Sequence, residues 1–271
     1  MKRITTTLTT LAAAAAVVAG PLAMTATTAQ AADAGARKAA TYKVTAKVNK
    51  DVVTVGEDVV KVRGKVTPRA AGQEVRLQQR KEGKNRWKGS GKATIKRNGT
   101  FVLKDKPSLA GTREYRVLKP AGKGLKKGTS PVLSVDVYKW EKLADRAKGA
   151  SANIPAYPGL TGAMIGSEYY DASLMPVESG TPAYVEYTLG RLCTDLRATY
   201  ALDDRSESGA TGAVKLLVDG ATKVDQGLVV GQVVESTTDV TDAFRLRYEL
   251  TSTATPASKP VVATPEVRCT K

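Results

Sequence analysis

A cluster of three acidic residues follows an apolar run in the second half of the sequence, and its carboxylates are candidates for metal binding or catalysis. Asp203 and Asp204 are adjacent, and Glu207 follows three residues later. Calcium prefers carboxylate and carbonyl oxygens, so these residues are candidate ligands for a structural calcium ion. Their spacing does not match an EF-hand loop. The alternative is a polar loop whose aspartates accept turn hydrogen bonds.

The sequence contains few residue patterns that could support catalysis. Adjacent aspartates at a strand end point in opposite directions, whereas the two acids of a glycosidase flank one bond. Histidine is absent, which excludes Ser-His-Asp triads, Cys-His pairs and histidine-ligated metal sites. We therefore predict that the chain is not an enzyme and has no cofactor besides the candidate calcium. A secreted inhibitor or an enzyme of an unfamiliar type remains a third alternative.

The two cysteines and the first residues indicate an exported protein. Met1-Lys2-Arg3 precedes the apolar run Leu11–Gly20, and Ala29-Gln30-Ala31 fits a signal-peptidase site. The apolar run is too short to span a bilayer, and we predict a signal peptide over residues 1–31 and no membrane span. In an exported chain, two cysteines most simply form one disulfide, here Cys193–Cys269. We expect the protein outside the cell, either secreted or associated with the cell wall.

Charge divides the sequence into two parts. Residues 42–138 hold 24 Lys and Arg against 8 Asp and Glu, and residues 151–271 hold 10 against 15. Such a change of sign indicates a domain boundary. We predict a flexible tether over 32–41, a basic domain over 42–138, a linker over 139–158 and a second domain over 159–271.

The basic domain could be a soluble spacer or could bind an anionic polymer of the cell wall. Nucleic acid would satisfy the same charge pattern, but export and the lack of interleaved stacking aromatics argue against it. The candidate polymer contacts lie in two basic runs: Arg80, Lys81, Lys84, Arg86, Lys88, Lys123, Lys126 and Lys127.

Both domains read as all-β, with two antiparallel sandwiches. Short runs rich in Val, Leu and Thr recur, each ended by Gly, Pro or Asn, as in Tyr42–Val48 and Glu74–Arg80. The order GKVTP, EVRLQQR, a lone Trp, NGTF and EYRV resembles the immunoglobulin-like modules of secreted actinobacterial proteins. In the second domain, the alternation in FRLRYEL places Phe244, Leu246, Tyr248 and Leu250 on one face, which is typical of a jelly-roll-like sandwich.

Residues 160–269 resemble the family called the novel putative carbohydrate-binding module. The resemblance is carried by Tyr169-Tyr170, by Tyr187–Gly190, by Asp203-Asp204 and by Val218-Asp219-Gly220. It implies a galactose-binding-like β-sandwich with a glycan site in its loops. The tryptophan and histidines common in this family are missing here. The aromatic residues left near the implied face are Tyr169, Tyr170 and Tyr184, which are our candidate ligand-binding residues.

Two functions follow from these observations. The first is a secreted, non-catalytic binding or adhesion protein that recognises an extracellular glycan or cell-wall polymer. The alternative is a structural protein of the cell envelope, held on an anionic wall by charge and without a specific sugar site.

Overall fold

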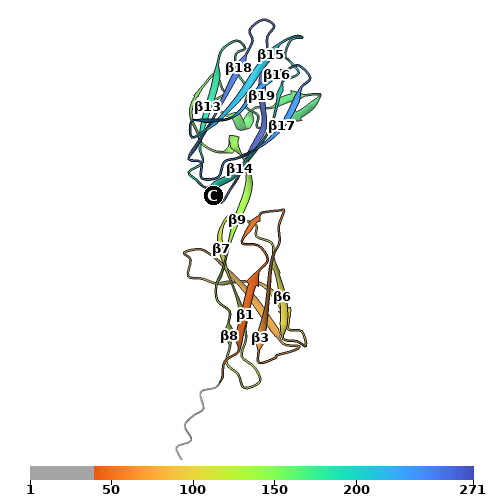
Figure 1. Cartoon of the computed structure of the whole chain (residues 1–271), viewed down its shortest axis with the longest axis vertical. Helices are drawn as coiled ribbons and strands as arrows, with labels where there is room; N and C mark the ends of the chain where they lie inside the picture. Colours follow the sequence, from red (N-terminus) through yellow and green to blue (C-terminus); the bar gives the residue numbers. More distant parts are fainter. Residues whose placement is uncertain (1–39) are drawn as a thin grey trace, which may run out of the picture. The chain divides into compact units, whose positions relative to one another are not determined.

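The computed structural model describes residues 40–271, which form an all-β protein, so the predicted fold class is confirmed (Figure 1). The predicted signal peptide and nearly all of the predicted tether lie outside the described residues. Within residues 40–271 the only helical segments are two single turns, η1 (Leu143–Asp145) and η2 (Pro158–Leu160). No helix in this part of the chain is long and apolar enough to cross a bilayer.

The first sandwich packs a three-stranded antiparallel sheet against a larger one. The smaller sheet has the order β1 (Lys43–Val48), β3 (Val60–Thr67) and β6 (Thr100–Asp105). The larger sheet contributes β9 (Leu133–Lys142), β7 (Gly111–Lys119), β4 (Glu74–Lys81) and β5 (Lys88–Thr94), with short β2 (Val52–Thr54) beside β9 and β8 (Gly128–Thr129) beside β7. Alternating Val, Leu and aromatic side chains from both sheets form one buried cluster.

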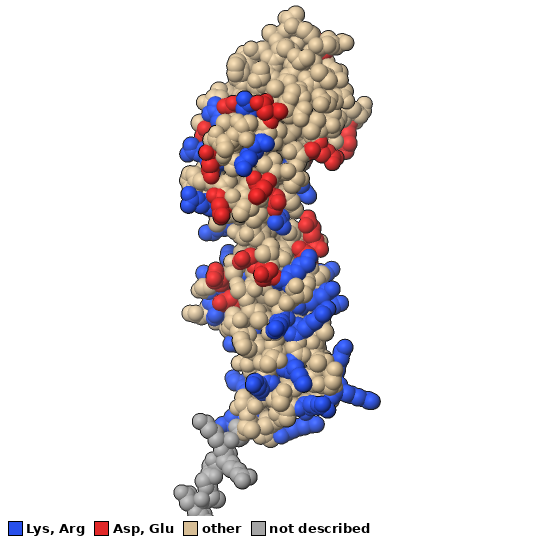
Figure 2. All heavy atoms as spheres, in the orientation of Figure 1, with Lys and Arg blue, Asp and Glu red and all other residues tan. Residues whose placement is uncertain are grey.

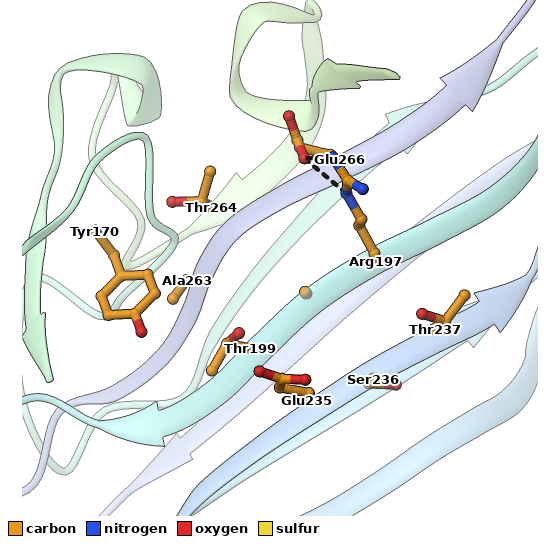
Figure 3. A pocket seen from close by; sticks show the side chains of 10 residues that line it. Tyr170, Arg197, Thr199, Glu235, Ser236, Thr237, Ala263, Thr264 and Glu266 are labelled. Atoms are coloured by element: carbon orange, nitrogen blue, oxygen red, sulfur yellow. Dashed lines mark hydrogen bonds and ion pairs between the residues drawn. The ribbon is translucent and has the colours of Figure 1, made fainter. Parts of the chain in front are cut away.

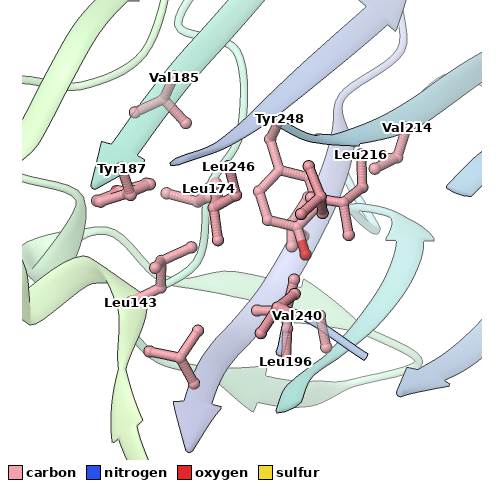
Figure 4. Packing of buried hydrophobic residues seen from close by; sticks show 14 of the residues in the cluster. Leu143, Leu174, Val185, Tyr187, Leu196, Val214, Leu216, Val240, Leu246 and Tyr248 are labelled. Atoms are coloured by element: carbon pink, nitrogen blue, oxygen red, sulfur yellow. The ribbon is translucent and has the colours of Figure 1, made fainter. Parts of the chain in front are cut away.

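The second sandwich has its own buried cluster (Figure 4). One sheet has the order β10 (Lys148–Ala152), β13 (Ala183–Thr188), β18 (Arg245–Ser252), β15 (Thr211–Val218) and β16 (Ala221–Val229). The other contains β17 (Val233–Asp239), β14 (Cys193–Leu202) and β19 (Pro260–Cys269). A hairpin of β11 (Ala163–Ile165) and β12 (Glu168–Tyr170) lies outside both sheets.

Strand β9 takes part in both sandwiches. Its first half pairs with β7, and residues 139–142 pair with β19. Further on, β10 pairs with β13. The segment 139–158, which we expected to be a linker, therefore contributes a strand to each sheet of the second sandwich. The division of the chain into two domains stays a prediction.

Two details of the second sandwich test the sequence patterns. The predicted disulfide is present, since Cys193 and Cys269 lie opposite each other on β14 and β19 and are bonded. In FRLRYEL, Leu246, Tyr248 and Leu250 are buried as expected. Phe244, which we placed on the same face, is 47% exposed. It precedes β18, where the strand alternation has not yet begun.

Candidate functional site

An open groove of about 470 Å³ lies over strands β14, β17 and β19 (Figure 3). The strand register explains its composition, because Arg197 on β14 lies opposite both Thr237 on β17 and Glu266 on β19. Alternation along each strand turns these polar side chains away from the core. The lining residues are Tyr170, Arg197, Ala198, Thr199, Glu235, Ser236, Thr237, Ala263, Thr264 and Glu266.

A β-bulge on β19 shapes one side of the groove. Between the pairs Arg197–Glu266 and Thr199–Ala263, one residue of β14 faces two residues of β19. The first residue of the bulge, Thr264, has a φ of 37°, and its hydroxyl donates to the carbonyl of Asp171 at 2.7 Å. Bulges re-aim side chains and interrupt pairing. Here the bulge joins the sheet to the segment that follows the β11–β12 hairpin.

The charges in the groove are unequally paired. The Arg197 guanidinium binds the Glu266 carboxylate at 2.7 Å and stacks 4.2 Å from the ring centroid of Trp140. Glu235 forms no ion pair with any residue in 40–271. At one end of the groove the Arg197–Glu266 pair is therefore backed by the Trp140 ring, and the floor of the groove offers the Glu235 carboxylate and threonine hydroxyls to a ligand.

Tyr170 supplies the aromatic wall of the groove (Figure 3). Its hydroxyl donates to Glu168 at 3.2 Å. Desolvation, this hydrogen bond and the negative charges of Glu168 and Glu235 together raise the pKa of the Tyr170 phenol. The phenol therefore stays neutral at physiological pH and presents an apolar ring face beside polar groups.

The other two predicted tyrosines lie elsewhere. Tyr169 is 64% exposed and packs on Gly162, where an added Cβ would overlap the ring. Tyr184 lies on β13, in the other sheet of the sandwich, with the Arg247 guanidinium 3.8 Å from its ring centroid. The structure therefore does not bring the three tyrosines into one site, and only Tyr170 lines the groove.

Asp203 and Asp204 hold the hairpin that carries Tyr170. Asp203 is buried and accepts the Met164 N–H at 3.1 Å. Asp204 accepts the N–H groups of Gly166 at 2.8 Å and Ser167 at 2.9 Å. These donors belong to β11 and the turn that leads into β12. The two aspartates are thus positioning residues for the aromatic wall of the groove.

The pKa of Asp203 reflects this role. Desolvation raises it, but hydrogen bonds from the Arg205 guanidinium and from the N–H groups of Arg205 and Met164 outweigh that effect. The net result is a pKa below the usual value of 3.8.

The predicted calcium ligands do not converge. Glu207 accepts the Ala257 N–H at 2.7 Å, away from the donors of Asp203 and Asp204. Among residues 40–271 no group of three acidic, histidine or cysteine side chains is placed to hold a metal ion. The carboxylates serve as hydrogen-bond acceptors, which was the alternative reading of the sequence. The calcium site stays a prediction without a gathered ligand set.

The predicted polymer contacts fall at two ends of the first sandwich. Lys81, Lys84, Arg86 and Lys88 lie in and around the β4–β5 turn, next to the start of β7. The group Lys123, Lys126 and Lys127 follows the end of β7, a strand about 27 Å long at 3.3–3.4 Å per residue.

Arg80 does not contribute a free charge to either group. It pairs with Glu114 and lies over Trp87, with its guanidinium 4.5 Å from the ring centroid. Arg116 also lies over this ring, at 4.2 Å. The eight predicted residues therefore do not form one surface.

The sequence patterns missed Trp140, Arg197 and Glu266. Trp140 lies in the predicted linker, although Tyr138 and Trp140 continue the alternation of the strand that begins at Leu133. The alternation was the available signal. The pairing of β9 with the C-terminal strand β19 joins residues that are more than 120 positions apart in the sequence. No local pattern contains this information.

No family model matches the chain, and no curated protein matches it. Among solved structures, it is similar to a CBM51 module from Clostridium perfringens GH95 in complex with methyl-galactose, with a TM-score of 0.38 and 9% identity over 47% of this chain and 99% of that chain. It is also similar to a CBM36-1 domain of a multidomain xylanase from the hindgut metagenome of Trinervitermes trinervoides. The TM-score is 0.28 and the identity 11%, over 48% of this chain and 95% of that chain. For the structure of allantoicase, the TM-score is 0.24 and the identity 12%, over 80% of this chain and 79% of that chain.

Two of these structures are carbohydrate-binding modules. Their TM-scores are below 0.5, too low to carry an argument about ligand or activity. The candidate site therefore depends on the groove itself.

Proposed function

We propose that this chain is a secreted, non-catalytic protein that binds an extracellular glycan in the groove over β14, β17 and β19. One observation carries the proposal. The ring of Tyr170 forms a wall beside a floor of hydroxyl and carboxylate groups from Thr199, Thr264 and Glu235. A sugar presents an apolar ring face and a rim of hydroxyls, so an aromatic wall next to hydrogen-bonding groups is the complementary surface.

The chemistry of the groove favours binding over hydrolysis. Glycosidases use two carboxyl groups that flank the scissile bond. The groove contains two glutamates, but Glu266 is held by Arg197, which leaves Glu235 as the carboxylate available to a ligand. Export is supported by the disulfide, since such bonds persist in oxidising compartments.

A glycan array with the chain lacking residues 1–31 tests this proposal. The Tyr170→Ala variant should bind its glycan about fivefold more weakly, because one aromatic stacking contact contributes on the order of 1 kcal/mol. Tyr157→Ala is the matched control, since Tyr157 is 74% exposed and outside the groove. Wild-type binding to no glycan, or equal effects of the two substitutions, would refute the proposal.

The second candidate function is a structural envelope protein held by charge. It is favoured by the excess of Lys and Arg in residues 42–138, visible as the basic region of Figure 2. Retention on isolated cell walls that is lost at high ionic strength and unaffected by Tyr170→Ala supports this function. Retention that survives salt and requires Tyr170 supports the first.

A further inference from the structure

The outward positions of β1, β3 and β6 form a basic surface. Cross-strand register places Lys47 opposite Arg63 and Lys61 opposite Lys104. The remaining outward positions of the three strands carry Lys, Thr and Val, and none carries Asp or Glu. We call the six cations the basic sheet face: Lys43, Lys47, Lys61, Arg63, Lys65 and Lys104.

These six charges are not neutralised within the described chain. The ion pairs among residues 40–138 join Lys50 to Asp58, Arg76 and Lys92 to Glu74, and Arg80 to Glu114. None of them includes a residue of the basic sheet face. Figure 2 shows Lys and Arg gathered over the side where Figure 1 labels β3 and β6.

Like charges directly opposite each other in a sheet are destabilising. Two such pairs occur here, Lys47 with Arg63 and Lys61 with Lys104. A bound polyanion would relieve this repulsion, and a concentrated field of one sign also attracts such a partner at long range.

The spacing along β3 indicates what kind of polyanion fits. Lys61, Arg63 and Lys65 are two residues apart, which is about 7 Å in an extended strand. Two peptide residues contain six backbone bonds, and six bonds in an extended chain cover about 7 Å. A phosphodiester polymer with a three-carbon bridge also has six backbone bonds per phosphate, so its anions can follow the cations one for one.

The composition of the face distinguishes between polymers of this spacing. Its outward positions hold no aromatic residue that could stack on a base or a sugar ring. Trp87 lies in the β4–β5 connection of the opposite sheet, and both Arg80 and Arg116 stack on its ring. A hollow of about 510 Å³ lies beside Lys47, Arg63 and Lys65, and its other lining residues are small or aliphatic and include no aromatic side chain: Thr45, Ala46, Val48, Asn49, Gly64 and Thr100. This favours a polymer of phosphates and small polyols over a nucleic acid.

We infer that the basic sheet face binds a linear polyol-phosphate polymer with one phosphodiester per three-carbon unit. The inference rests on the charge-based candidate function for its extracellular setting, and it gives that function a surface and a chemical class. It does not involve the groove.

The sequence supplies a matched control for its test. Lys61, Arg63 and Lys65 follow the pattern Lys-x-Arg-x-Lys, and Lys84, Arg86 and Lys88 follow the same pattern around the β4–β5 turn. Changing either set to Gln removes three charges at the same sequence spacing, but only the first set lies along an extended strand. Binding of synthetic poly(glycerol phosphate) to the chain lacking residues 1–31 is measured by calorimetry over a series of salt concentrations.

For the triple variant of β3, the slope of log K against log salt should become shallower by about 2, since each phosphate contact contributes about 0.7. The single variant Arg63→Gln should change the slope by about 0.7 and tests the same point if the triple variant is unstable. The control triple variant and Tyr170→Ala should leave the slope unchanged. This last result separates the inference from the glycan proposal.

Three results would overturn the inference. The first is the absence of binding to poly(glycerol phosphate). The second is an equal change of slope in the two triple variants, which would mean that net charge alone acts. The third is tighter binding of single-stranded DNA with the same number of phosphates, which would assign the face to nucleic acid.

Discussion

The disulfide between Cys193 and Cys269 should supply much of the stability of the second sandwich. It closes a loop with a sequence separation of 76 residues. In the chain-entropy model, closing a loop of this length in the unfolded state contributes about 4.5 kcal/mol. Reduction of the wild-type protein removes the link and leaves both buried side chains in place. With a urea m-value of about 2 kcal/mol/M, the unfolding midpoint should fall by about 2 M.

The two tryptophans allow each sandwich to be followed separately. Trp140 lies opposite Arg268, next to the disulfide, and Trp87 lies in the first sandwich. Urea titrations of Trp87→Phe and Trp140→Phe, with and without reductant, assign the transitions. We expect reduction to move the Trp140 transition and to leave the Trp87 transition in place. A loss of less than about 1 kcal/mol would refute the loop-entropy reasoning, and an equal shift of both transitions would contradict the predicted division into two domains.

Two further predictions concern single residues. Asp203→Asn should lower the free energy of unfolding at pH 7 by about 1–3 kcal/mol, because the buried carboxylate that accepts hydrogen bonds from the Arg205 guanidinium and the Met164 N–H is replaced by a neutral amide. The pKa of Asp203 is lowered in the folded state, so its ionised form stabilises the fold above the ordinary pKa of 3.8. This stabilisation is lost as the pH falls through the folded-state pKa. The urea midpoints of the wild type and of Asp203→Asn should therefore converge in acid. Gly64→Ala should destabilise the first sandwich by about 1–3 kcal/mol, because a Cβ there would overlap the Thr45 carbonyl oxygen. Gly227→Ala meets no atom within 4 Å and should leave the thermal midpoint nearly unchanged.

Local patterns predicted the strands well, because alternation depends only on neighbouring residues. The predicted strand Glu74–Arg80 ends one residue short of the observed β4, and the predicted strand Tyr42–Val48 begins one residue before the observed β1. The disulfide was also predictable, since two cysteines in an exported chain leave one pairing.

The arrangement of the candidate site was much less predictable. Alternation tells which side chains point outward but not which sheet they belong to, so Tyr170 and Tyr184 looked equivalent in the sequence. Strand order places them over different sheets. The same limit applies to Asp203 and Asp204, whose donors lie about 40 residues earlier in the chain. Such long-range pairing is decided by the packing of the whole core.

The pairing of β9 with β19 sets a limit on how this protein can be divided. A fragment that begins after residue 142 would lose the strand that covers β19 from Glu266 to Cys269. The backbone N–H and C=O groups of β19 would then be free to pair with another molecule, and uncovered strand edges of this kind lead to aggregation. A recombinant fragment of the second sandwich should therefore include residues 139–142, even though the charge of the sequence changes sign only later.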